Sequence, residues 1–149
     1  MNTFFRLSVK EDLPTLLQLE EQCFSTDRLN SRSFQWMINR ANGQLLVAQR
    51  GEHLLGYALV LFHRRTSLAR LYSIAIATRA RGNGLGGQLL DCVEAIALKH
   101  ECTFLRLEVR VDNPAALALY ERNGYRRFDL IHDYYQDHVD ALRMEKRLA

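Results

Sequence analysis

The sequence lacks the features of membrane-spanning, disulfide-bonded and metal-binding proteins. Its 149 residues contain no run of about 18 apolar residues, the length that a membrane-spanning helix needs, and the N-terminus has no signal-peptide pattern. The three cysteines are an odd number without CxxC spacing, and the five histidines have no metal-ligand spacing. Because Cys23 and Cys92 lie in apolar helical patterns, we expect reduced, mostly buried thiols and a cytoplasmic location. The missing apolar run and the missing metal-ligand spacing lead us to expect no membrane partner and no metal.

The sequence also carries little excess charge and no sign of a second domain. The 20 basic and 17 acidic residues leave a net charge of +3, which suits an anionic ligand, and no basic run exceeds two residues. We therefore expect no nucleic-acid partner. Repeats, low-complexity tracts and linkers are absent, and the length is typical of one domain, which we predict over residues 1–149.

A glycine-rich turn is the most informative stretch that is present. Four glycines and two arginines fall within residues 79–87, after an apolar strand-like run and before a helical apolar pattern. Glycines allow positive φ and close approach of a ligand, and a helix N-terminus offers unpaired N–H groups. This order of strand, turn and helix predicts a phosphate-binding loop. Its residues are Arg81, Gly82, Asn83, Gly84, Leu85, Gly86 and Gly87.

The spacing Gly82-x-Gly84-x-x-Gly87 also matches the dinucleotide pattern GxGxxG, and the acidic residue Glu108 lies about twenty positions further on. In a dinucleotide-binding unit the first glycine follows the strand directly, whereas residues 78–81 intervene here. A second mononucleotide-binding half and a GxxxxGK[ST] motif are both absent. We therefore disfavour a nicotinamide-binding domain. A turn without a ligand is the other alternative, but it leaves the two arginines unexplained.

Residues 104–110 predict a strand with one apolar and one charged face, because apolar residues alternate with Arg106, Glu108 and Arg110. A central strand of an α/β sheet is usually apolar on both faces, so the charged face is expected to line a cleft. Two flanking arginines would favour the carboxylate form of Glu108, and an ionised glutamate can accept a proton directly or through water. The alternative is an exposed ladder of salt bridges.

Hydrophobic periodicity and turn residues predict a mixed α/β fold in the order β-α-α-β-β-β-α-β-α-β-β. The predicted strands are Phe4–Val9, Gln44–Gln49, His53–Phe62, Ala69–Ala77, Phe104–Arg110, Tyr125–Tyr134 and His138–Arg147. The predicted helices are a first one after Asp12 to about residue 24, Ser33–Arg40, one from the glycine turn to Lys99, and one from Pro114 to about Asn123.

The last predicted helix carries two further candidates. Asn113 is a favourable N-cap before Pro114, and Tyr120 lies seven residues further along on the same helical face. A tyrosine beneath a sheet is usually part of the core. Its hydroxyl needs a partner when buried, and a leaving group is one such partner.

Taken together, these residues resemble the GNAT superfamily of acetyl-CoA-dependent N-acetyltransferases. Residues 81–86 fit that family's [Q/R]-x-x-G-x-[G/A] pyrophosphate loop, and the chain is most similar to the ribosomal-protein alanine N-acetyltransferase (RimI-type) subgroup. The residues that carry this second likeness are Leu107–Arg110, Asn113, Ala115, Ala116, Ala118–Glu121, Gly124 and Tyr125.

The resemblance implies a fold and a set of roles. The fold would be a mixed sheet of about seven strands flanked by about four helices, with two splayed central strands. Acetyl-CoA would be the co-substrate, its pyrophosphate held by the backbone of residues 81–87 and its pantetheine amides paired with the main chain of Ile74 and Ile76. Asn113 would contact the cofactor, Glu108 would act as general base and Tyr120 as general acid.

The resemblance also implies an amine acceptor, which we expect to be the N-terminal α-amine of a protein or peptide. A small-molecule amine or a lysine side chain is the alternative, and a non-catalytic acyl-CoA-binding module is a third possibility. The resemblance is weak over residues 25–43, where the family varies and where the acceptor binds. Residues 24–29 lack the proline- and tryptophan-containing segment of the subgroup, and residues 61–68, also in an acceptor region, are more basic than the subgroup's pattern. Tyr134 and Tyr135 match an aromatic pair that could line a peptide slot, and two tyrosines on an exposed hairpin are the alternative. We expect a monomer or a homodimer.

Overall fold

The computed structural model describes residues 2–39, 42–63 and 65–149, and one seven-stranded sheet runs through them. The strand order is β1-β2-β3-β4-β5-β7-β6, and β4 and β5 are the parallel pair in an otherwise antiparallel sheet. The strands are β1 (Phe4–Leu7), β2 (Gly43–Arg50), β3 (His53–Phe62), β4 (Leu68–Ile76), β5 (Phe104–Arg110), β6 (Arg126–Ile131) and β7 (Ala141–Arg147). The α-helices are α1 (Leu13–Cys23), α2 (Ser31–Asn39), α3 (Leu85–Lys99) and α4 (Pro114–Arg122).

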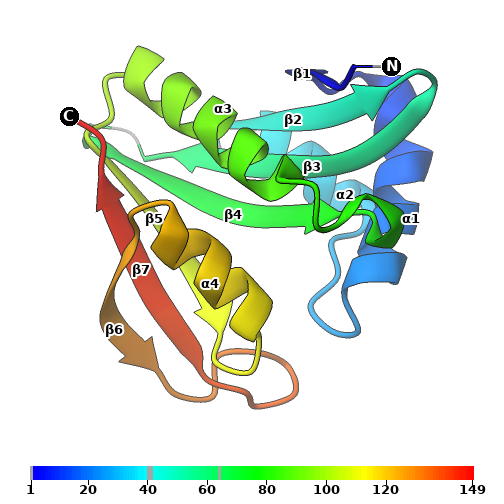
Figure 1. Ribbon diagram of the computed structural model, residues 1–149. Helices are drawn as coiled ribbons and strands as arrows, with labels where there is room; N and C mark the ends of the chain where they lie inside the picture. The colour runs from blue at the N-terminus through cyan, green and yellow to red at the C-terminus, as the bar shows by residue number, and fades with distance from the viewer. Residues whose placement is uncertain (1, 40–41, 64) are drawn as a thin grey trace.

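The helices cover the two faces of the sheet unequally (Figure 1). Helix α3 lies across β2, β3 and β4 on one face, and α4 lies on the same face over the other half of the sheet. Helices α1 and α2 lie on the opposite face, against β2, β3 and β4. On that opposite face, none of the described helices covers β5, β7 and β6.

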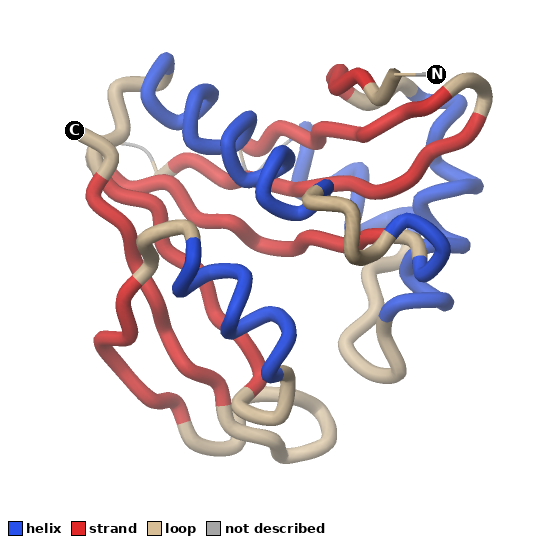
Figure 2. Tube along the Cα trace, viewed as in Figure 1, coloured by secondary structure: helices blue, strands red, loops and turns tan. Residues whose placement is uncertain are grey.

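Strands β4 and β5 separate soon after they begin. Their pairing is limited to Leu68 with Phe104, Ala69 with Leu105 and Arg70 with Arg106. Figure 2 shows the two halves of the sheet diverging from this point, with α4 on one half and α3 on the other. The predicted splay of the two central strands is therefore confirmed, and it leaves the edge of β4 beyond Arg70 free of a strand partner on that side.

The helix after the glycine turn forms as its apolar pattern predicts. Leu85, Leu89, Leu90, Val93 and Ala97 are all buried, because residues three and four apart lie on one face of a helix. Helix α4 also has its predicted ends. The Asn113 side chain accepts a hydrogen bond from Ala116 N at 3.1 Å, and Gly124 follows the helix with φ 93°.

The predicted final hairpin is wrong in its length. Its strands were expected over 125–134 and 138–147, whereas β6 ends at Ile131 and β7 begins at Ala141. The Asp140 carboxylate accepts a hydrogen bond from Asp133 N at 2.8 Å, and Asp133 and His138 have positive φ. These local bonds replace strand pairing and create a loop over residues 132–140.

Other predicted boundaries differ by a few residues. Strand β1 ends at Leu7 rather than Val9, and α2 begins at Ser31 rather than Ser33, while its predicted end at Arg40 lies outside the described residues. All three cysteines are free, but only Cys102 is buried, and Cys23 and Cys92 are half-buried. No helix in the described part of the chain is long and apolar enough to span a membrane.

The close packing of β3 and β4 gives a stability prediction at Gly56. A Cβ atom there would lie 2.6 Å from the carbonyl oxygen of Ala75, which is backbone and cannot move aside easily. We expect Gly56→Ala to lower the free energy of unfolding by about 1–3 kcal/mol, as overpacking does. In Gly87→Ala the new Cβ meets its nearest atom at 3.8 Å, so this control should keep or raise stability. Equal denaturant midpoints for the two variants would contradict the prediction.

Candidate active site

The glycine turn has the geometry of an anion-binding loop. Gly82 and Gly84 have φ values of 83° and 78°, and Gly84 is the N-cap residue of α3. No atom lies within 4 Å of a Cβ placed at either glycine, so the backbone there is open to a ligand. The first backbone hydrogen bond into the helix runs from Gln88 N to Gly84 O at 3.2 Å, which leaves the amides of the first turn available to an anion.

Arg81 contributes to this turn in a way that the sequence did not predict. Its Nε atom donates to the Ile76 carbonyl at 3.0 Å, and Cys23 Sγ lies 3.4 Å from the same oxygen. Arg81 therefore closes the turn against the end of β4 and does not only add positive charge. The Ile76 carbonyl, expected to pair with pantetheine, already has two donors from the protein.

A cleft of about 650 Å³ opens where β4 and β5 diverge. It is bounded by the end of α1 and the loop after it, by β4, by the end of β5, by α4 and by the loop of residues 132–140. The predicted site residues that line it are Ile74, Glu108, Asn113, Tyr120, Tyr134 and Tyr135.

Glu108 lies in this cleft with its side chain 7% exposed. Arg70 forms an ion pair with one carboxylate oxygen, and the Tyr134 hydroxyl lies 3.3 Å from the same atom. The other oxygen, Oε2, lies 3.5 Å from Arg143 Nε without hydrogen-bond geometry. Within the described residues Oε2 is buried and has no hydrogen-bond partner, so it can accept one from a water molecule or an amine.

The partners of Glu108 differ from those predicted. The arginines two residues away on β5 were expected to flank the carboxylate, but Arg106 pairs with Glu145 at 2.9 Å, and Arg110 pairs with Asp112 and Asp137. Arg70 and Arg143 take their place because β4 and β7 are the neighbours of β5, and Arg143 stands directly opposite Glu108 in the register. The sequence signal that could have identified Arg70 as a partner of Glu108 is its position as a charged residue within an otherwise apolar strand.

The two groups that contact Glu108 Oε1, Arg70 and Tyr134, are both protonated at neutral pH. Burial opposes the charge of Arg70, but the Glu108 carboxylate and the Tyr134 hydroxyl outweigh it, so the pKa of Arg70 is raised. Burial, followed by the negative charge of Glu108, raises the pKa of Tyr134. Tyr134 is therefore a phenol at neutral pH, and it can donate its hydrogen to the carboxylate.

Tyr120 reaches the same cleft from α4. The residue is 5% exposed, and its ring packs edge-on against that of Tyr125 with centroids 5.9 Å apart. No described residue forms a hydrogen bond with its hydroxyl, and burial raises the pKa of the phenol well above its usual range. The cleft thus contains a protonated hydroxyl group without a protein partner.

The acceptor side of the cleft is only partly where it was predicted. Residues 23–27 and Leu29 line it, and Asp27 N donates to Gln136 Oε1 at 3.1 Å while Gln136 N donates to Asp27 Oδ2 at 3.2 Å. The described residues 61–63 and 65–68 do not line it, and Leu68 pairs with Phe104 at the far end of β4 and β5 from Glu108. Arg64, in that predicted region, lies outside the described residues.

A buried polar network behind the cleft was not predicted at all. Glu20 is 2% exposed and accepts hydrogen bonds from the Tyr57 hydroxyl and from Leu29 N, the latter at 2.8 Å. The Tyr57 hydroxyl also lies 2.8 Å from Ser73 Oγ on β4. Burial raises the pKa of Glu20. The network ties the loop after α1 to the sheet and so sets the width of the cleft.

Comparison with known proteins assigns the chain to a family. The sequence profile of the acetyltransferase (GNAT) family matches residues 11–125. The chain belongs to the GNAT family. It is therefore an acetyltransferase domain, and the family uses acetyl-CoA as the acetyl donor.

Similar proteins agree with this assignment. The chain is 30% identical to the ribosomal protein bS18-alanine N-acetyltransferase of Salmonella typhimurium, over 97% of this chain and 96% of that protein. It is also 30% identical to an N-acetyltransferase of Methanocaldococcus jannaschii, over 92% of this chain and 86% of the other. The ribosomal-protein-S18-alanine N-acetyltransferase of Escherichia coli has the same fold, with a TM-score of 0.88 at 23% identity over 99% and 95% of the two chains.

Proposed function

We propose that this GNAT N-acetyltransferase acetylates the N-terminal α-amine of a protein or peptide, with Glu108 as general base and Tyr120 as general acid. The observation that carries the proposal is the convergence of two complementary groups on one cleft. Among the described residues, the buried Glu108 oxygen Oε2 has no hydrogen-bond partner, and neither has the hydroxyl of Tyr120, a residue that is 5% exposed. One can receive a proton and the other can donate one.

An α-amine needs only a weak general base, because its pKa is close to neutral pH. An ammonium group has no lone pair, so the amine must lose a proton before it attacks the thioester carbonyl. A protein α-amine has a pKa of about 7.7–8.0, whereas that of a lysine side chain is about 10.4. Glu108 Oε2 accepts the proton through a water molecule, and Arg70 and Tyr134 keep the carboxylate in position.

The acid completes the transfer. When the tetrahedral adduct collapses, the bond from carbon to sulfur breaks and a thiolate leaves, and Tyr120 donates its hydroxyl proton to that sulfur. The main chain of residues 81–87 holds the pyrophosphate of acetyl-CoA, and the free edge of β4 at Ile74 pairs with the pantetheine arm. Asn113 lies at the mouth of the cleft, where its amide nitrogen contacts the same ligand.

The α-amine is the preferred acceptor among the alternatives because of the relatives. The Salmonella typhimurium protein is named for the alanine of a ribosomal protein. A structure of the NatC complex with a Gag peptide and CoA has a TM-score of 0.85 to this chain at 20% identity. Small amines and lysine side chains remain the second candidate class, since an open cleft of this volume also accepts them.

A peptide assay distinguishes these acceptors. We expect thiol release with peptides that have a free N-terminus, and about 10²-fold slower release with N-blocked peptides that carry one lysine, from the difference in neutral amine at pH 7.5. A panel of small polyamines and amino acids provides the comparison. Faster transfer to the lysine peptide or to a small amine would replace the proposed acceptor, and CoA binding without transfer to any amine would support a non-catalytic module.

A further inference from the structure

The helix-free face of β5, β7 and β6 carries a group of arginines beside the active site. On this face Glu108 stands opposite Arg143, Arg106 opposite Glu145, and Phe104 opposite Arg147. Arg126 on β6 pairs in register with Glu145 and lies on the same face. We refer to these four arginines as the arginine face. Its members are Arg106, Arg126, Arg143 and Arg147.

The positive charge of the arginine face is only partly balanced. Glu145 pairs with Arg106 at 2.9 Å, and Asp129 lies 3.9 Å from Arg143. Arg126 is exposed and forms no ion pair with any described residue. The exposed ring of Phe128 lies beneath the guanidinium groups of Arg106 and Arg143, at 5.1 and 5.4 Å. Stacking on an aromatic face is a favourable arrangement for a guanidinium group, which keeps its rigid set of hydrogen-bond donors.

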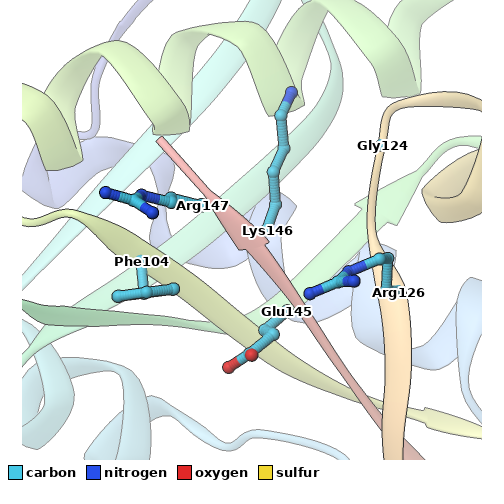
Figure 3. A pocket seen from close by; sticks show the side chains of 6 residues that line it. All are labelled: Phe104, Gly124, Arg126, Glu145, Lys146 and Arg147. Atoms are coloured by element: carbon cyan, nitrogen blue, oxygen red, sulfur yellow. The ribbon is translucent and has the colours of Figure 1, made fainter. Parts of the chain in front are cut away.

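The arginine face is continuous with the catalytic cleft at one end and with a second cavity at the other. Arg143 approaches Glu108 at 3.5 Å. At the start of β5, a cavity of about 550 Å³ is lined by Phe104, Gly124, Arg126, Glu145, Lys146 and Arg147 (Figure 3). Of these, Lys146 points away from the other charged side chains in this view and binds Glu94 of α3 at 2.9 Å.

The cleft and the arginine face have opposite electrostatic character. The charged residues that line the cleft include more carboxylates than guanidinium groups: Glu20, Asp27, Glu108 and Asp112 against Arg70 and Arg110. An acceptor amine is cationic before it reacts, so the cleft suits its approach. The arginine face suits an anion that lies a short distance behind that amine.

We propose that the arginine face binds acidic side chains at about the third to fifth positions of the acceptor polypeptide, which makes an acidic N-terminal segment the preferred substrate. This inference rests on the proposed function. On β5, Arg106 is two positions from Glu108 and Phe104 is four positions from it, which correspond to about 7 and 13 Å along the strand. An extended peptide advances about 3.3–3.6 Å per residue, so its third to fifth side chains reach the arginines when its amine is at Glu108. Planar guanidinium groups bind carboxylates with paired hydrogen bonds.

Matched peptides and a matched pair of arginine variants test this inference. The peptides share one first residue and carry Glu, Gln or Lys at positions 3–5, in series that begin with Ala, Ser, Gly and Met. Arg126→Gln removes one charge from the arginine face. Arg127→Gln removes the same charge from the next residue, which is exposed on the opposite side of the same strand and pairs with Glu121. Arg106→Gln provides a second variant on the arginine face.

We expect about tenfold higher kcat/KM for the Glu peptide than for the Gln peptide at low ionic strength, and a lower value still for the Lys peptide. Raising the salt concentration should reduce the preference, because these charges are exposed. Arg126→Gln and Arg106→Gln should each reduce it about two- to fivefold, whereas Arg127→Gln should leave it unchanged.

Each contrary outcome has a distinct meaning. Equal kcat/KM for the Glu, Gln and Lys peptides overturns the inference and leaves N-terminal acetylation intact. A preference for Glu that survives both arginine substitutions also overturns it, because recognition then lies elsewhere. Transfer to no peptide of any series overturns both the inference and the proposed function.

Discussion

Glu108→Gln is expected to lower kcat by about 10²–10⁴-fold, the usual contribution of a general base. Glutamine retains the shape of the side chain and its hydrogen bond with Arg70, but its amide cannot take a proton from the amine. Binding of CoA should be retained, because the predicted pyrophosphate loop and the edge of β4 are untouched. Steady-state rates with the best peptide and calorimetry with CoA measure the two effects separately.

The variant also needs a control for the loss of a carboxylate. Glu121→Gln removes an exposed carboxylate from α4, where its partner is Arg127 on the surface. We expect this variant to retain its kcat. A pH profile adds a second reading: the Glu108→Gln rate should rise with pH as the free amine becomes neutral by itself. If Glu108→Gln turns over within about threefold of the unaltered protein, another group is the base.

Tyr120→Phe is expected to lower kcat by about 10²-fold or more while leaving the fold intact. The Tyr120 hydroxyl has no hydrogen-bond partner among the described residues, so removing it breaks no bond within the protein. Because burial raises the pKa of this phenol, it stays protonated through neutral and mildly alkaline pH, and its own ionisation should not appear as an alkaline fall in rate. An acetyl donor with a more acidic thiol should recover much of the lost rate, since a better leaving group needs less protonation.

Tyr125→Phe is the matched control for that experiment. The Tyr125 ring packs against Tyr120, but its hydroxyl donates to Glu94 Oε2 at 2.9 Å. Its removal should therefore lower the free energy of unfolding by about 1–3 kcal/mol and change kcat little. Loss of stability in Tyr120→Phe together with an unaltered kcat would mean that Tyr120 is part of the core and not the acid.

Under the proposed function, the groups that perform the chemistry and the loops that contact the acceptor belong to different parts of the chain. Glu108 and Tyr120 lie on β5 and α4, whereas Asp27 and Gln136 join the two loops that bound the acceptor side. Loops can change their sequence without moving the sheet, because few of their backbone bonds belong to it. Residues 24–29, where the chain departs from the RimI-type pattern, lie in the loop that follows α1.

The sequence alone determined the features of this protein that depend on local backbone periodicity. The element order, the buried face of α3, the cap of Asn113 and the end of α4 shortly before Gly124 all follow from residues within about one or two helical turns of each other. The likeness to the GNAT family followed from contiguous motifs for the same reason. Alternation within β5 was also enough to select Glu108 as a residue at a charged face.

Only the tertiary structure decided which groups surround Glu108 and where the cleft ends. Arg70 and Arg143 approach the carboxylate because their strands, β4 and β7, lie on either side of β5. The register of β5 with β7 places Arg143 directly opposite Glu108. Pairing between strands is a non-local choice, and shifting a strand by one residue turns every side chain to the other face. The same physics explains why the described residues 61–63 and 65–68 do not line the cleft and why the arginine face is visible only once β6 and β7 are paired.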